Sequence, residues 1–148
     1  MTKKLKLTID LVPASSWNQN LRSLLKPKMW ENLRKETYKK YKFRCAFCKS
    51  QGRLHAHEVW DYDDKNYVQK LVNIIALCSK CHEVKHIGFA GIQSSKGNLN
   101  YESLVKHFMM VNNCSRDIFK KHYNETFEKF EKRSHYDWTP DLSLLERF

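Results

Sequence analysis

The chain has 148 residues, of which 41% are hydrophobic, and its four glycines and three prolines exclude the collagen-like and low-complexity classes. Lys and Arg number 27 against 16 Asp and Glu, which gives a formal net charge of +11. This excess attracts polyanions and predicts a nucleic-acid partner. No apolar run approaches the roughly 20 residues of a membrane span, and the basic N-terminus lacks the apolar block of a signal peptide. We therefore expect a cytoplasmic protein without membrane contact.

The first segments alternate between extended and helical patterns. Residues 3–11 alternate apolar and polar side chains, which predicts a half-buried strand. After a break at residues 12–16, Ser16 is placed to cap a short helix that runs through Leu25. Pro27 then opens a second helix, because proline is favoured in the first helical turn. Apolar and aromatic side chains recur in that helix at helical spacing, at Trp30, Leu33, Thr37 and Tyr41.

The second half of the chain reads as a loop followed by two helices. Residues 88–99 hold three of the four glycines and predict a loop. A helix is expected from Tyr101 to Val111, and Ser115 is placed to cap a last, longer one. The tail from Tyr136 is too apolar to be free, so we expect it to dock on the body. One compact domain over residues 1–148 is the simplest organisation.

Four of the five cysteines form two C-x-x-C pairs, Cys45 with Cys48 and Cys78 with Cys81. In a chain without an export signal this pattern indicates metal binding rather than a disulfide framework. Two pairs supply four thiolates, which is enough for a closed tetrahedral zinc site. A redox site would need only one pair, so we predict a structural Zn²⁺. Cys114 stands apart and is expected to be a small buried or half-buried hydrophobe.

Histidines lie within and directly after the region framed by these cysteines. If the second pair opens a helix, His82 and His86 are four residues apart and share one helix face. Two imidazoles at that spacing can bind one metal ion. His57 precedes the second pair in the stretch LHAHEVW, and a third imidazole from a nearby strand would complete a second metal site.

The pieces CAFC, LHAHEVW, VNIIALC and SKCHEVKH resemble the HNH endonuclease family over about residues 43–87. The flanks are more weakly similar to small bacterial and phage HNH proteins. The resemblance implies an α+β fold with a ββα-metal core, in which two antiparallel strands and a helix surround a divalent ion. In its treble-clef form this core is held by four cysteines and a structural zinc. An N-terminal strand and helix segment and two C-terminal helices are expected to flank it.

The resemblance also implies roles for individual residues. The structural zinc ligands would be Cys45, Cys48, Cys78 and Cys81. His82 and His86 match the helix histidines that face a catalytic divalent cation, which would be Mg²⁺, Mn²⁺, Ni²⁺ or Zn²⁺. Asn73 matches the asparagine that gives the family its middle letter, with the role of pinning the strand–loop geometry and orienting the base.

The first histidine position departs from the family pattern, which has His-His or Asp-His where this chain has His57-Glu58. In the favoured register His57 binds metal and Glu58 stands at the general-base position. In the other register His57 is the base and Ala56 fills the ligand position, which it cannot serve. A third option uses His55, which would share a strand face with His57. A carboxylate is a weaker base than imidazole, although it is ionised at neutral pH.

We therefore expect a metal-dependent HNH endonuclease that hydrolyses phosphodiester bonds in DNA. Phosphate contacts are predicted for Arg53, Lys80 and Lys85, which lie near the histidine strand and helix. One alternative is a catalytically silent zinc-fold module that binds nucleic acid. Another is a nuclease subunit of a larger phage or defence system. One active site cuts one strand, so duplex cutting would indicate a homodimer or a larger complex.

Overall fold

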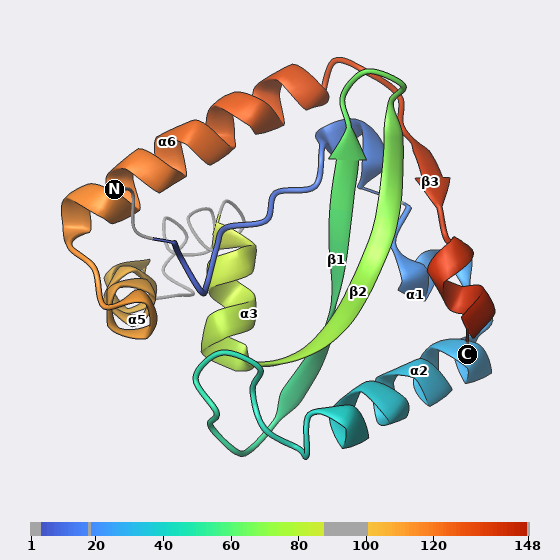
Figure 1. The fold of residues 1–148 in the computed structure, drawn as a ribbon, viewed down its shortest axis with the longest axis horizontal. Coiled ribbons are helices and arrows are strands. Elements are labelled where there is room, and N and C mark those ends of the chain that lie inside the picture. The colour runs from blue at the N-terminus through green and yellow to red at the C-terminus, as the bar shows by residue number, and fades with distance from the viewer. Residues whose placement is uncertain (1–3, 18, 88–100, 148) are drawn as a thin grey trace.

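The computed structural model describes residues 4–17, 19–87 and 101–147. Over these residues the chain has an α+β fold with one three-stranded mixed sheet and helices around it (Figure 1). The strands are β1 (Leu54–Asp63), β2 (Val68–Cys78) and β3 (Thr139–Asp141). The α-helices are α1 (Leu21–Leu24), α2 (Pro27–Lys40), α3 (Ser79–Lys85), α5 (Tyr101–Asn112) and α6 (Arg116–Arg133). Two short 3₁₀ turns are η1 (Ala14–Ser16) and η2 (Ser143–Arg147).

The sheet is built on a long hairpin in which β1 and β2 pair antiparallel, while β3 adds to β2 in parallel. His57 lies opposite Ile75, and Val59 lies opposite Asn73. The register then shifts between Val59 and Trp60, so that β2 carries the extra residue Val72, which is 41% exposed. A bulge of this kind bends the strand and changes which side chains share a face.

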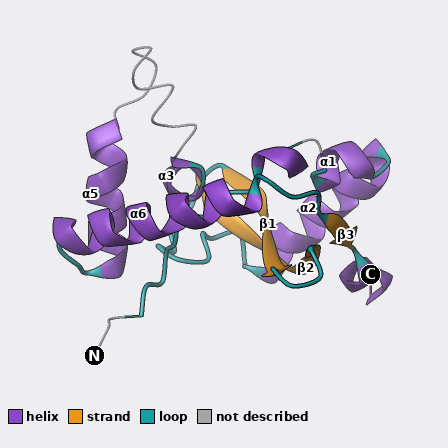
Figure 2. Ribbon diagram, turned by 90° about the horizontal axis from the view of Figure 1, so that it is seen from above, coloured by secondary structure: helices purple, strands orange, loops and turns teal. Residues whose placement is uncertain are grey.

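Two hydrophobic clusters lie on the two faces of the sheet. Ile75 and Leu77 pack with the buried residues of α3, α5 and α6, whereas Leu71 and Ile74 pack with those of α1, α2 and η2. Figure 2 shows α3 and α5 on one side of the sheet and α1 and α2 on the other. Residues 74–77 of β2 are buried on both faces and form a continuous apolar run, which holds the two halves of the molecule together.

Several helix boundaries follow the local sequence signals. Pro27 occupies the first turn of α2, as predicted. Ser115 caps α6 by accepting a hydrogen bond at Oγ from the backbone N–H of Ile118. The predicted helix at Tyr101 is α5. The short helix expected after Ser16 begins only at Leu21, as α1, and Asn20 caps it through the N–H of Ser23, while Ser16 ends the preceding turn η1.

The N-terminal segment differs from the predicted strand. Leu7 and Ile9 are buried as the alternation requires, yet the described residues 4–11 form no strand, because no neighbouring strand pairs with them. Side chains satisfy the backbone instead: Asn112 Oδ1 accepts from the N–H of Leu7, and His122 Nε2 accepts from the N–H of Ile9. The segment is therefore bound to α5 and α6 through side-chain hydrogen bonds.

The remaining expectations concern the loop, the tail and membrane contact. Residues 88–99 lie outside the described residues. The tail docks as predicted, since Trp138 and Leu145 are buried. Among the described helices, none combines the length and the apolar character that crossing a bilayer requires. The single compact domain over residues 1–148 stays a prediction.

Candidate metal centres

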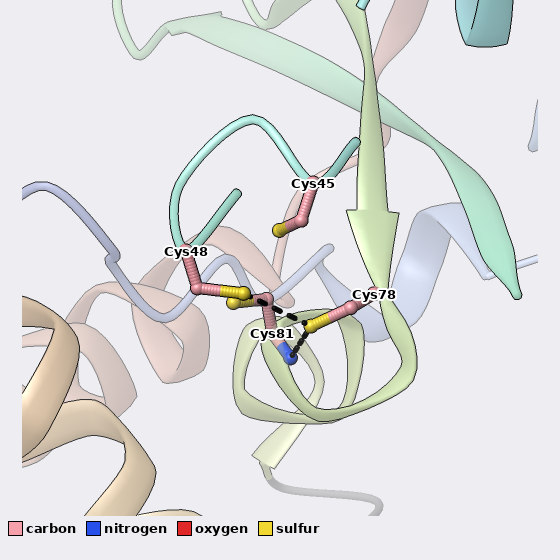
Figure 3. Close-up of side chains that lie close together, drawn as sticks. All are labelled: Cys45, Cys48, Cys78 and Cys81. Atoms are coloured by element: carbon pink, nitrogen blue, oxygen red, sulfur yellow. Dashed lines mark hydrogen bonds between the residues drawn. The ribbon is translucent and has the colours of Figure 1, made fainter. Parts of the chain in front are cut away.

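The four predicted cysteines converge on one point, with their sulfur atoms all within 4.8 Å of one another (Figure 3). Cys45 and Cys48 lie on the turn before β1, Cys78 ends β2 and Cys81 lies in the first turn of α3. The Cys81 N–H donates to Cys78 Sγ at 3.4 Å, so the sulfur also caps the helix. The two sulfur atoms of each C-x-x-C pair converge because the pair spans a tight turn. For the second pair, this turn lies where β2 ends and α3 begins.

The electrostatics of the cluster favour a bound cation. A hydrogen bond from Cys81 lowers the pKa of the Cys45 thiol to about 4, and that same interaction raises the pKa of Cys81. Burial raises the pKa of Cys78 as well. Without a cation, then, these thiols resist joint ionisation, whereas a divalent ion would stabilise all four thiolates. The structure describes all five cysteines of the chain, and none forms a disulfide. The donor set and its clustering are consistent with structural Zn²⁺.

His107 on α5 is a neighbour of this cluster that sequence reasoning missed. Its Nε2 lies 3.2 Å from Cys81 Sγ, which is itself fully buried. An imidazole N–H so placed would donate to a metal-bound thiolate, the kind of outer contact that orients a ligand. Nothing in the local sequence around His107 indicates this contact, because the two residues come from separate helices.

The three predicted histidines also converge, and their ligand nitrogens all lie within 4.8 Å of one another. We call His57, His82 and His86 the histidine triad. His57 projects from β1 and is 5% exposed, while His82 lies in α3 and His86 is its C-cap. The ring centroids of His82 and His86 are 4.8 Å apart, and that of His57 lies 5.2 Å from His86. The triad is thus a possible second metal site.

Burial keeps the helix histidines in the form that binds metal. It lowers the pKa of His82 to about 3 and that of His86 to about 4, with the neighbouring imidazoles adding to the effect. Both rings are therefore neutral at pH 7, and each offers a lone pair to a cation. His55 lies beside the triad rather than in it: its ring stacks on His82 at 4.7 Å and contacts Ser79 Oγ at 3.1 Å.

Asp10 is a second residue that sequence reasoning missed. Its Oδ2 accepts a hydrogen bond from His57 Nε2 at 3.2 Å and lies 3.1 Å from Lys85 Nζ. Burial acts to raise the pKa of Asp10, but the hydrogen bond from His57 and the charge of Lys85 outweigh it and lower this pKa to about 2. In the sequence Asp10 is only the polar position of an alternating segment, so its role was not visible.

Lys85 was expected to contact phosphate, but it is 4% exposed. Its Nζ pairs with Asp10, donates to Thr8 Oγ1 at 3.0 Å and lies 5.1 Å from the ring centroid of Phe47. The Lys85 ammonium group forms an internal ion pair, and it is not accessible to a phosphate. By contrast Arg53 and Lys80, the other two expected contacts, are exposed.

Glu58 and Asn73 lie beside the triad without belonging to it. Glu58 Oε1 accepts a hydrogen bond from the backbone N–H of Leu21 at 2.7 Å, at the start of α1. Burial raises the pKa of Glu58. Glu58 and the triad nevertheless line one hollow of about 320 Å³, so the carboxyl group borders the candidate metal site. Asn73 lies opposite Val59 on β2, and its Oδ1 accepts from the N–H of Ile74.

Comparisons with known proteins add no relative: no protein-family model matches the chain, and neither a curated protein nor a solved structure matches it.

Proposed function

We propose that this protein is a metal-dependent endonuclease of the HNH type that hydrolyses phosphodiester bonds in DNA. The observation that supports it most strongly is the convergence of His57, His82 and His86 beside the four-cysteine cluster. Two antiparallel strands followed by a helix carry both groups, in the order that the treble-clef ββα-metal resemblance implies. No other cluster of three or more metal-ligating side chains occurs among the described residues.

In this proposal the triad holds a divalent cation, and the four cysteines hold structural zinc. The catalytic cation would act as a Lewis acid on the phosphoryl group and the leaving oxygen. The protein's own task is then to supply a base and to hold the triad rigid. Three imidazoles on a strand and a helix provide such a rigid frame.

We assign the general base to Glu58. It lines the same hollow as the triad, and its carboxyl group accepts hydrogen bonds from the Leu21 N–H and from the Trp60 side chain. In this assignment the carboxylate would take a proton from the attacking water. Burial raises the pKa of Glu58, which brings it nearer to neutral pH and strengthens it as a base.

A second assignment has its own support. In it His57 takes the proton, and Asp10 holds the imidazole in one orientation and stabilises its protonated form. The hydrogen bond between His57 Nε2 and Asp10 Oδ2 favours this arrangement, because a carboxylate behind a histidine is a common way to orient a catalytic imidazole. His82 and His86 would then hold the cation without His57.

DNA is the proposed substrate because of the charge distribution. The net charge is +11, and the exposed side chains of Arg53 and Lys80 flank the triad strand and helix. The α2 helix adds the exposed lysines Lys28, Lys35, Lys39 and Lys40. These charges would contact phosphates without reading sequence. Cutting both strands would require a second copy of the chain or a larger complex.

A supercoiled-plasmid nicking assay with Mg²⁺, Mn²⁺, Ni²⁺ and Zn²⁺ tests the proposal. We expect nicking with at least one of these cations, and we expect His82→Ala to abolish it. His135→Ala is the matched control, since His135 is exposed and outside the triad. A parent protein that binds DNA but nicks with none of the four cations would instead support a silent zinc-fold binding module.

A further inference from the structure

A hollow of about 510 Å³ lies next to the triad, between the N-terminal segment, the sheet and α6. Its walls include the aromatic side chains of Trp17, Trp60, Phe127 and Phe130. Trp17 stacks on Phe130, with ring centroids 6.3 Å apart and planes inclined by 18°. The volume of the hollow falls within the range of small-molecule sites. Flat aromatic side chains in its walls favour a flat aromatic guest.

Three polar atoms in residues around this hollow lack a hydrogen-bond partner. They are Ser16 Oγ, Gln19 Oε1 and Gln69 Oε1, and among the described residues they are the only buried side-chain nitrogen or oxygen atoms in that condition. Gln69 is 1% exposed and Ser16 is 2% exposed. Leaving a buried polar atom unpaired is costly, so three in one place indicate a guest that supplies their partners.

The hollow also borders the proposed active site. His86 of the triad and Glu58 both contribute to its lining. A group held here is therefore adjacent to the phosphate that the triad would engage. In a nucleic-acid strand the group adjacent to a phosphate is a nucleoside, which carries a flat aromatic base.

We propose that this hollow binds one unpaired nucleobase of the substrate strand, an inference that rests on the proposed function. The base stacks on the aromatic walls, and its exocyclic amino group donates to the amide oxygens of Gln19 and Gln69. Adenine, cytosine and guanine carry such an amino group, whereas thymine does not. A base inside a duplex cannot enter, so the protein prefers single-stranded or locally unpaired sites.

Binding of labelled pentanucleotides d(TTXTT) tests this, with adenine, cytosine, guanine, thymine or an abasic site at X. Fluorescence anisotropy is measured on purified protein with no divalent cation added, and a gel of each strand after the measurement checks that it is uncut. We expect the adenine strand to bind about tenfold more tightly than the abasic strand, since stacking on aromatic side chains is substantial. Thymine should lie between them. Equal affinities for the adenine and abasic strands would overturn the proposal.

Two variants separate base recognition from folding. Gln69→Met removes a buried amide oxygen that has no hydrogen-bond partner, so we expect it to keep or raise the melting temperature while the preference for adenine over thymine disappears. Gln51→Met is the matched control at an exposed position outside the hollow. Trp17 is 63% exposed, so Trp17→Ala should leave the fold intact. It should weaken the binding of the strands with each of the four bases by a similar factor. Unchanged base preference in Gln69→Met would overturn the assignment.

These outcomes are distinct from a failure of the proposed function. If the parent discriminates between bases but never nicks a plasmid, the catalytic proposal fails and the base site stands. If the parent nicks plasmid but treats the abasic and adenine strands alike, the base site fails and the catalytic proposal stands.

Discussion

Asp10 accepts a hydrogen bond from His57 across 3.2 Å, although the two residues are 47 positions apart in the chain. Asp10 also binds the buried ammonium group of Lys85, whose backbone carbonyl accepts from the N–H of Asp10 at 2.9 Å. One carboxylate therefore links the N-terminal segment, β1 and α3. The triad depends for its support on a segment outside the region of the family resemblance.

The first prediction concerns that link. Asp10→Asn leaves the Lys85 ammonium buried without its counter-charge, and we expect a loss on the order of 3 kcal/mol in the free energy of unfolding, measured by urea denaturation. Adding Lys85→Met should recover most of the loss, because the double variant has no unpaired charge. Additive losses in the double variant would show that the two groups are not coupled.

The second prediction concerns the four-cysteine cluster. Cys78→Ser should lower the zinc content in elemental analysis and lower the melting temperature by on the order of 10 °C, because binding of zinc by the four cysteines would contribute folding energy. Cys114→Ser is the control, since Cys114 lies outside the cluster, and it should retain zinc. A parent protein without zinc that keeps full stability in strong chelator would exclude a structural zinc site.

The third prediction is a pH dependence at His122. Burial lowers the pKa of His122 below 6.5, and its Nε2 must be unprotonated to accept from the N–H of Ile9. The unfolded chain therefore takes up a proton first as the pH falls below 6.5. The contribution of His122 to the free energy of unfolding is therefore complete above that pH. Below it, this contribution declines by up to about 1.4 kcal/mol per pH unit.

The matched variant for this effect is His122→Gln, which keeps a polar side chain that does not titrate in this range. Urea denaturation of both proteins between pH 7.5 and pH 5, on the zinc-loaded form, gives the difference. The parent should lose more stability than the variant as the pH falls. Parallel curves would mean that His122 does not contribute.

The fourth prediction decides the general base. Glu58→Gln keeps an amide oxygen that can accept from Leu21, so the fold and the metal content should be unchanged. If Glu58 is the base, nicking should fall by about 100-fold or more, because an amide takes no proton from water at neutral pH. A fully active Glu58→Gln would shift the assignment to His57, and His57→Ala should then be inactive with His82 and His86 still holding metal.

Much of the fold was readable from the sequence, because it depends on short-range rules. Pro27 and Ser115 mark helix starts through local geometry and capping, and both positions are confirmed. The two C-x-x-C pairs and the i, i+4 histidines bring their ligands together through a single turn or a single helix face. Each cysteine pair and the two helix histidines therefore follow from neighbouring residues, whereas the meeting of the two pairs depends on the β1–β2 hairpin between them.

Tertiary structure alone decided which distant groups meet. Asp10 reaches His57, His107 reaches Cys81, and Lys85 is buried rather than exposed, because separate segments pack together there. Alternation along β1 directs His57 and Glu58 to opposite faces, but only the packed structure shows Asp10 facing one and Leu21 facing the other. Local sequence patterns record hydrogen bonding and periodicity within a segment. They carry no record of which segment covers each face, and that is what determines burial, charge pairing and the surroundings of the site.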